Sequence, residues 1–324
     1  MVYFRRRVLH LIPVFFLVTF ASFMMINLLP GDLVDAILLN EESAVPDAET
    51  RAILEKELNL DRPVVIRYGI WLGNLLRGNM GRSYVTQQPV TEALAQRIPV
   101  SLQLMLMSQF LALVIAIPVG LFTAFRAGKP VDRWISATAF AILSIPIFVV
   151  ATALIYLFAI MLDWLPSSGH AQMSKDLWLN FKGFLLPAVS IAMIEIPILM
   201  RVLRTDMIST LQEDFIAFAK AKGMSNWYIL FHHALRPSSF TLVTVLGLQL
   251  GRLIAGTIII ETLFSLPGVG KLLIDAVDNR DEIMVQGVIT FIAIIYVIVN
   301  LIVDFLYAVL DPRVGLQSRG GGLR

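Results

Sequence analysis

Residues 100–125 read VSLQLMLMSQFLALVIAIPVGLFTAF and contain no charged side chain. An α-helix rises about 1.5 Å per residue, so roughly 20 apolar residues cross the hydrocarbon core of a bilayer, which is about 30 Å thick. Core helices of soluble proteins are usually shorter than this stretch. The stretch therefore predicts a transmembrane helix.

Other apolar stretches of similar length lie at 8–29, 134–162, 183–200, 240–263 and 285–310. Hydrophobic residues make up 57% of the 324 residues and charged residues 15%, whereas soluble domains have about 45–50% and about 25%. The first stretch follows Arg5, Arg6 and Arg7 as in a signal peptide, but it exceeds the roughly 7–15 apolar residues of such a signal. We expect an all-α membrane protein with six transmembrane helices.

The Lys and Arg residues indicate which side of the membrane each loop occupies. With the N-terminus in the cytoplasm, the short basic loop at 126–133, the segment 201–236 and the C-terminal tail lie inside. The segments 30–99, 163–182 and 264–284 lie outside, and together they are acidic. Because cytoplasmic loops carry an excess of Lys and Arg, we expect both termini in the cytoplasm, an N-in/C-in topology.

The segment 30–99 is long enough for a small extracytoplasmic helical subdomain. Residues 47–58 and 64–76 have the apolar periodicity of amphipathic helices. A glycine-rich turn at 78–81 follows, and 89–98 predicts a short helix that leads into the next span. The subdomain either caps the outer ends of the helices or offers a docking surface to a partner.

The sequence lacks the residue clusters that catalysis or metal binding needs. It has no cysteine and four histidines; His232 and His233 are adjacent, and consecutive helical residues point too far apart to share one ion easily. The run GVGK at 268–271 resembles the end of a phosphate-binding loop, but Ser265 and Leu272 replace the glycine and the Ser or Thr of that motif. A net charge of +2 gives no basic surface for nucleic acid. We expect no enzyme activity, metal site, bound cofactor or nucleic-acid partner.

Ionisable residues inside the predicted spans are candidates for a solute pathway: Glu195, Arg252, Glu261 and Asp304. Each costs about 2.5 kcal/mol or more unless it faces protein or water. Counted from the cytoplasmic ends, Glu195 and Asp304 lie about 9 Å deep and Arg252 about 18 Å deep. These side chains can form an interhelical ion pair, line a polar pathway, or do both. Glu261 is near the outer boundary and can also reach water.

Gly247 and Gly251 have the GxxxG spacing that lets two helices approach closely. This spacing predicts tight packing of the fifth span. It does not distinguish packing within the chain from packing against a second subunit.

A cytoplasmic segment has the composition of a short helix that lies along the membrane face. Its alanines at 217, 219 and 221 favour helix, and Gly223 predicts the helix end, with Lys220 and Lys222 in the last turn. Such a helix fits either a groove on another protein or a surface of anionic lipid. The candidate docking residues are Asp214, Phe215, Ala217, Ala219, Lys220, Lys222, Gly223, Met224 and Ser225.

The same segment resembles the coupling loop of the permeases of binding-protein-dependent ABC importers, in which alanines are followed by a glycine. Further motifs are similar to the oligopeptide and dipeptide branch and occur in the same order along nearly the whole chain. They are LPGD at 29–32, LDRP at 60–63, GNMGRS at 78–83, IIETLF at 259–264, PGVG at 267–270 and DPR at 311–313.

The resemblance implies a type I ABC importer permease-like bundle in a prokaryotic cell membrane. A homologous permease would supply the other half of the pathway, two ATPase subunits would bind ATP and Mg, and an extracytoplasmic solute-binding protein would deliver the cargo. The expected organisation is 1–29 for the N-terminus and first span, 30–99 for the outer subdomain, 100–310 for a five-helix core with the coupling loop 201–238, and 311–324 for a cytoplasmic tail.

Two other classes of protein are compatible with apolar spans. A stand-alone ion-coupled secondary transporter would use Glu195 and Asp304 as titrating groups, and many such carriers have duplicated halves, which this sequence does not show. An intramembrane hydrolase would need paired His and Ser or Asp in facing spans. The sequence does not identify the transported solute, which can be a peptide or another small molecule. It also does not show whether the permease pair is homomeric or heteromeric.

Overall fold

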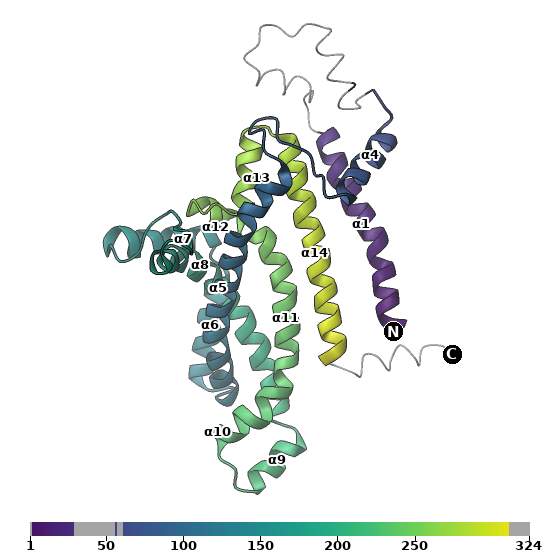
Figure 1. Cartoon of the computed structure of the whole chain (residues 1–324). Helices are drawn as coiled ribbons and strands as arrows, with labels where there is room; N and C mark the ends of the chain where they lie inside the picture. The colour runs from purple at the N-terminus through teal and green to yellow at the C-terminus, as the bar shows by residue number, and fades with distance from the viewer. Residues whose placement is uncertain (1, 29–55, 57–60, 311–324) are drawn as a thin grey trace.

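The computed structural model describes residues 2–28, 56 and 61–310 (Figure 1), and the regular elements in these residues are helices. They are α1 (Val2–Leu28), α4 (Val64–Leu76), α5 (Val90–Phe125), α6 (Pro130–Leu143), α7 (Ile147–Leu154), η1 (Ile155–Met161), α8 (Leu177–Thr210), α9 (Asp214–Ala221), α10 (Asn226–Tyr228), η2 (Ile229–Ala234), α11 (Leu235–Gly256), α12 (Ile258–Leu263), α13 (Val269–Asp278) and α14 (Glu282–Leu310). The elements η1 and η2 are π-helices.

Among the described residues, three helices are long and apolar enough to cross a membrane by themselves: α5, α8 and the Glu282–Val303 part of α14. A fourth span results if α6 and the helical segment Ile147–Met161, which comprises α7 and η1, are counted together as one bent span. The predicted helices at 8–29 and 240–263 correspond to α1 and to α11 followed by α12. The all-helical architecture is confirmed, and the number of six spans stays a prediction.

The apolar stretch 134–162 does not form the single straight helix that the sequence predicts. It is broken at 144–146, and the two helical parts meet at 98°. Pro146 causes the break, because its ring disfavours a helical conformation of the residue before it. The break stays hydrogen-bonded: the Ser144 amide and hydroxyl both donate to the Phe140 carbonyl, at 3.2 and 3.1 Å.

Helices α5 and α8 form the most extensive helix pair of the bundle. Small residues let their backbones approach: a Cβ atom added at Gly120 would lie 3.2 Å from the carbonyl oxygen of Met200. Ala112 and Ala116, on α5, are completely buried in the same core cluster. The loop that leads to α9 begins at the end of α8, so α9 is connected directly to this helix pair.

The GxxxG glycines of α11 pack within the chain. A Cβ atom at Gly247 would overlap the side chain of Val303, and one at Gly251 would lie 3.3 Å from the ring of Tyr296. Val303 and Tyr296 both belong to α14. The close approach that the spacing predicts is therefore the contact between α11 and α14.

The outer segment is described from residue 61 onward. The predicted helix at 64–76 is α4, and it packs on α1 through a 2.8 Å hydrogen bond between the hydroxyls of Tyr68 and Thr19. The predicted helix at 47–58 lies outside the described residues except for Lys56. A separate helix at 89–98 is wrong, because α5 runs through Pro99 without a break.

The turn at 78–81 is confirmed and holds the outer segment against the start of α14. Gly78 and Gly81 have φ values of 81° and 92°, which favour glycine. Ser83 is completely buried and donates a hydrogen bond to Asp281. Asp281 also accepts a 3.1 Å bond from the Met284 amide, so it caps the first turn of α14.

We predict that Gly247→Leu destabilises the bundle by about 1–3 kcal/mol, because the added side chain overpacks the contact between α11 and α14. The matched control is Gly73→Leu, since no atom lies within 4 Å of a Cβ atom at Gly73 of α4. Thermal unfolding of the purified chain in detergent measures both variants. Equal melting temperatures for the two variants would contradict the packing assigned to Gly247.

Candidate functional site

The short helix α9 ends where the sequence predicts. Gly223 has φ 76°, its amide donates to the Lys220 carbonyl at 2.9 Å, and the Met224 amide donates to the Ala219 carbonyl at 3.3 Å. These two bonds form the Schellman motif, which closes a helix with a left-handed glycine. Asp214 in the first turn and Lys220 in the last turn complement the helix dipole.

One face of α9 is anchored in the core of the protein. Ile216 and Ala219 are 0% and 4% exposed, and they belong to a core cluster that includes Leu121 of α5 and Leu203 and Met207 of α8. Because the Ala219 side chain points into this core, it is not available to a partner. Ala219 therefore anchors α9 on the bundle, and the docking role of the predicted residues stays a prediction.

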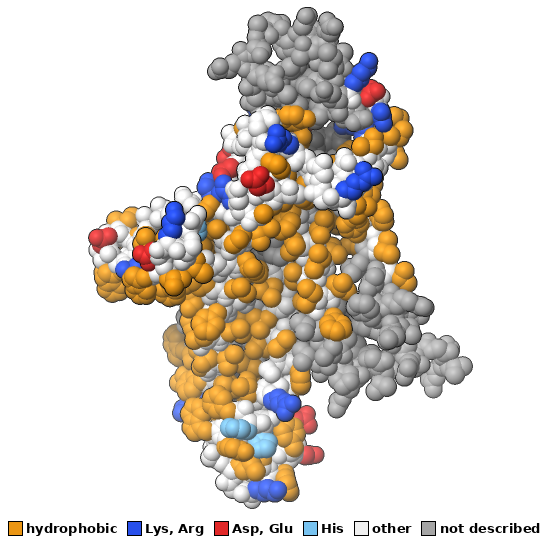
Figure 2. All heavy atoms as spheres, in the orientation of Figure 1, with side chains coloured by type: hydrophobic (Ala, Val, Ile, Leu, Met, Phe, Trp, Pro, Cys, Tyr) orange, Lys and Arg blue, Asp and Glu red, His pale blue; other side chains and the backbone are white. Residues whose placement is uncertain are grey.

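The opposite face of α9 is open. Phe215 and Phe218 are 46% and 63% exposed, and Ala217 is also exposed. The ammonium group of Lys222 lies 4.5 Å from the centre of the Phe218 ring, a cation–π contact. Helices α9 and α10 lie at the end of the bundle opposite α13 (Figure 1). Figure 2 shows basic, acidic and histidine side chains gathered at this end, below a broad hydrophobic surface.

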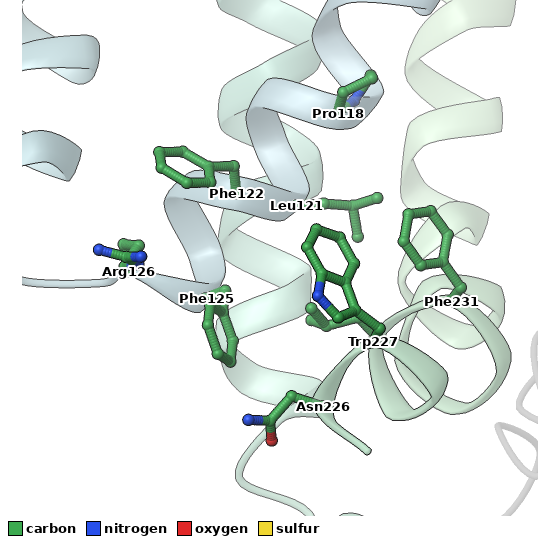
Figure 3. Close-up of a pocket in the computed structure, with 9 residues that line it drawn as sticks. Pro118, Leu121, Phe122, Phe125, Arg126, Asn226, Trp227 and Phe231 are labelled. Atoms are coloured by element: carbon green, nitrogen blue, oxygen red, sulfur yellow. The ribbon is translucent and has the colours of Figure 1, made fainter.

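An apolar cavity of about 420 Å³ lies between the end of α5 and the segment of α10 and η2. Trp227 and Phe231 stack on one another, with ring centres 5.9 Å apart, and face Phe122 and Phe125 of α5 across the cavity (Figure 3). Arg126 lies at its edge and is stacked on Phe122 at 5.5 Å. The cavity lining contains no carboxylate, histidine or other catalytic base.

Ser225 and the two adjacent histidines lie at α10 and at the π-helix η2 that follows it. The Ser225 hydroxyl accepts a 3.3 Å bond from the Tyr228 amide and so caps α10. His232 stacks on the Tyr228 ring with centres 4.3 Å apart, and His233 contacts the edge of the same ring. Within the described part of the chain, no three His, Cys, Asp or Glu side chains come together as metal ligands.

Glu261 is completely buried and does not reach water, contrary to the sequence interpretation. Its carboxylate accepts hydrogen bonds from the Ser101 hydroxyl at 2.6 Å and from the Gly270 and Lys271 amides at 2.7 and 3.1 Å. A Cβ atom at Gly268 would overlap this carboxylate. The glycine-rich run that resembles a phosphate loop therefore binds an anion of its own chain, at the N-terminus of α13.

The other predicted intramembrane residues lie on neighbouring helices. Glu195 is on α8 with 9% of its surface exposed, while the side chains of Arg252 on α11 and Asp304 on α14 lie outside the described part. Helix α11 contacts both α8 and α14. The pairing and pathway roles of these three residues stay predictions.

An ion pair that the sequence did not reveal joins the start of α6 to the last turns of α8. Arg204 donates two 2.7 Å hydrogen bonds to the two oxygens of Asp132, and Asp132 is only 2% exposed. The Gly128 amide donates a further 2.8 Å bond to Asp132. These residues are too far apart in sequence for any helical spacing to predict the pair, which ties α6 to α8.

The chain is similar to a known family of transport proteins. Residues 116–316 match the family model described as "Binding-protein-dependent transport system inner membrane component". A putative peptide transport system permease protein of Brucella abortus is 37% identical over 313 residues, covering 95% of this chain and 97% of the relative. The di/tripeptide transport system permease protein DppB of Pseudomonas aeruginosa is 34% identical, covering 96% of this chain and 98% of the relative.

A solved structure shares the fold. A chain of the inward-facing MetNI methionine ABC transporter superposes with a TM-score of 0.55 and 16% sequence identity, covering 68% of this chain and 96% of that chain. At this identity the likeness concerns the fold alone. It confirms the permease-like helical bundle that the sequence motifs implied.

We predict that Glu261→Ala lowers the stability of the protein by about 1–3 kcal/mol, because buried amide donors at the start of α13 lose their acceptor. The matched control is Glu92→Ala, since Glu92 is an exposed acid in the first turn of α5. The fraction of protein that stays monodisperse after heating measures the loss. If both variants lose the same fraction, Glu261 does not hold the helix junction.

Proposed function

The chain belongs to the family of binding-protein-dependent transport system inner membrane components, and on this premise we propose that it forms half of the pathway of a peptide importer. It is a permease subunit of an ABC importer and resides in the inner membrane of a prokaryote. The observation that carries the proposal is the similarity over nearly the full chain to permeases named for peptides and for di/tripeptides. The same similarity favours an importer subunit over a stand-alone ion-coupled transporter.

The proposed importer divides its work among several chains. A homologous permease completes the pathway, two ATP-binding subunits bind and hydrolyse ATP with Mg, and an extracytoplasmic binding protein delivers the peptide. The present chain binds no cofactor in this scheme. The family description supports the need for a binding protein, because it describes these components as binding-protein-dependent.

We assign α9 as the contact with an ATP-binding subunit. Phe215, Ala217 and Phe218 are exposed on the part of α9 that does not pack on the bundle, and an exposed apolar helix surface of this kind fits a groove on a partner. Its buried face, Ile216 and Ala219, is packed against α5 and α8. Movement of the ATP-binding subunit would therefore pass through α9 directly to the two most closely packed helices of the bundle.

The proposed pathway uses the polar groups of the bundle interior. Glu195, Arg252 and Asp304 are on α8, α11 and α14, of which α11 contacts both of the others, and they remain the candidates for polar lining. Glu261 is removed from this set, because Ser101 and the start of α13 surround its carboxylate. Its role is to hold the outer helix junction.

We predict that liposomes containing this chain with its partner permease and both ATP-binding subunits take up labelled tripeptide only with ATP and the binding protein. Accumulation of label inside the vesicles measures uptake. Liposomes that contain this chain alone should accumulate none. Uptake by the chain alone would reject the importer assignment, and uptake of other solutes but no peptide would reject the substrate class.

We predict that Ala217→Arg prevents co-purification of the ATP-binding subunits, because a long charged side chain then projects from the exposed face of α9. The matched control is Ala127→Arg, which adds the same side chain at an exposed position of another loop on the same side. Affinity purification in mild detergent measures the amount of ATP-binding subunit per chain. Normal recovery with Ala217→Arg would exclude α9 as the contact.

A further inference from the structure

A second cavity, of about 320 Å³, lies between α6 and α8 near the ion pair of Asp132 and Arg204. None of the functional roles assigned above uses it. One part of its wall is basic, with Arg133 and Arg201, and the rest is largely apolar, with Ala139, Leu143, Pro197 and Met200.

The basic part of the wall has an excess of positive charge. Asp132 is fully engaged by Arg204, through two 2.7 Å hydrogen bonds, and neutralises it. Neither Arg133 nor Arg201 forms an ion pair with a carboxylate within the described residues. The guanidinium of Arg201 lies 4.9 Å from the centre of the Phe140 ring, which holds it at the cavity.

The polarity of the wall changes with depth. Helix α6 begins at the cytoplasmic loop, so Leu143 lies about 15 Å deeper than Arg133 at 1.5 Å per residue. Helix α8 runs the other way toward α9, so Pro197 lies about 6 Å deeper than Arg201. Arg133 therefore lies at the loop end of the wall, and the guanidinium of Arg201 lies beside Phe140, which is about 10 Å further along α6. The apolar wall extends beyond both arginines into the hydrocarbon region.

The surface beside the cavity has the character of a membrane interface. Trp134, next to Arg133, is 75% exposed, and Phe140 is 51% exposed. Exposed tryptophan is typical of the headgroup level of a bilayer. An occupant of this cavity needs an anionic group at the surface and an apolar part below it.

We propose that this cavity binds an anionic phospholipid of the cytoplasmic leaflet. Arg133 and Arg201 hold the headgroup phosphate, as basic pockets between transmembrane helices do. One acyl chain lies along Ala139, Leu143 and Met200. The lipid holds α6 against α8 beside the ion pair of Asp132 and Arg204, and its binding does not depend on the transported solute.

The test uses the complete transporter in mild detergent with equal parts of dioleoyl phosphatidylglycerol and dioleoyl phosphatidylcholine, analysed by native mass spectrometry. The transporter should retain phosphatidylglycerol in preference to phosphatidylcholine. The double variant Arg133→Gln/Arg201→Gln should lower the retained phosphatidylglycerol by about fivefold for each arginine removed. The matched control is the double variant Arg126→Gln/Lys129→Gln, because it also removes two exposed basic side chains, and Arg126 is also stacked on a phenylalanine ring.

A second measurement needs no variant. Phosphatidylglycerol with a photoreactive acyl chain should cross-link to residues 139–143 and 197–200 of the unaltered chain. Cross-links confined to other segments, equal retention of the two lipids, or equal losses in the double variant and the control would overturn the proposal. Displacement of the lipid by inorganic phosphate would also overturn it, since the site would then recognise a free anion.

Discussion

Buried carboxylates at the helix junctions hold this bundle together, and each needs hydrogen-bond donors to replace the water it has lost. Glu261 receives donors from the start of α13 and from α5. Asp281 joins the outer turn to the start of α14, and Asp132 joins α6 to α8. Apolar contacts bring the helices together along their length, while these three groups determine how neighbouring helices meet at their ends.

At the end of the bundle that carries α9, this helix and the bundle form one packed body. A single core cluster contains residues of α5, α8, α9, η2 and α11. Because protein interiors are close-packed and have low compressibility, a displacement of α9 must be accompanied by a displacement of its neighbours. The exposed face of α9 can therefore serve a partner while its buried face transmits the movement.

The sequence predicts features that depend on local composition, and misses those that depend on distant residues. Apolar length predicts the long helices, and Gly223 predicts the end of α9, because both follow from backbone chemistry. The proline content does not predict the break at Pro146, since Pro118 and Pro197 lie inside continuous helices. The donors to Glu261 and the partner of Asp132 come from other elements, so their pairing requires the folded chain.

The bend at Pro146 also has a consequence for the order in which the protein is built. Helix α7 is held by contacts with α8 and α12, and its cluster includes Phe184, Ile260 and Phe264. All of these follow α7 in the chain, so a ribosome makes them later. The arm from α7 to η1 therefore leaves the ribosome after α5, whose Val100 and Leu104 belong to the same cluster, and before α8 and α12, so its contacts with these two helices form last.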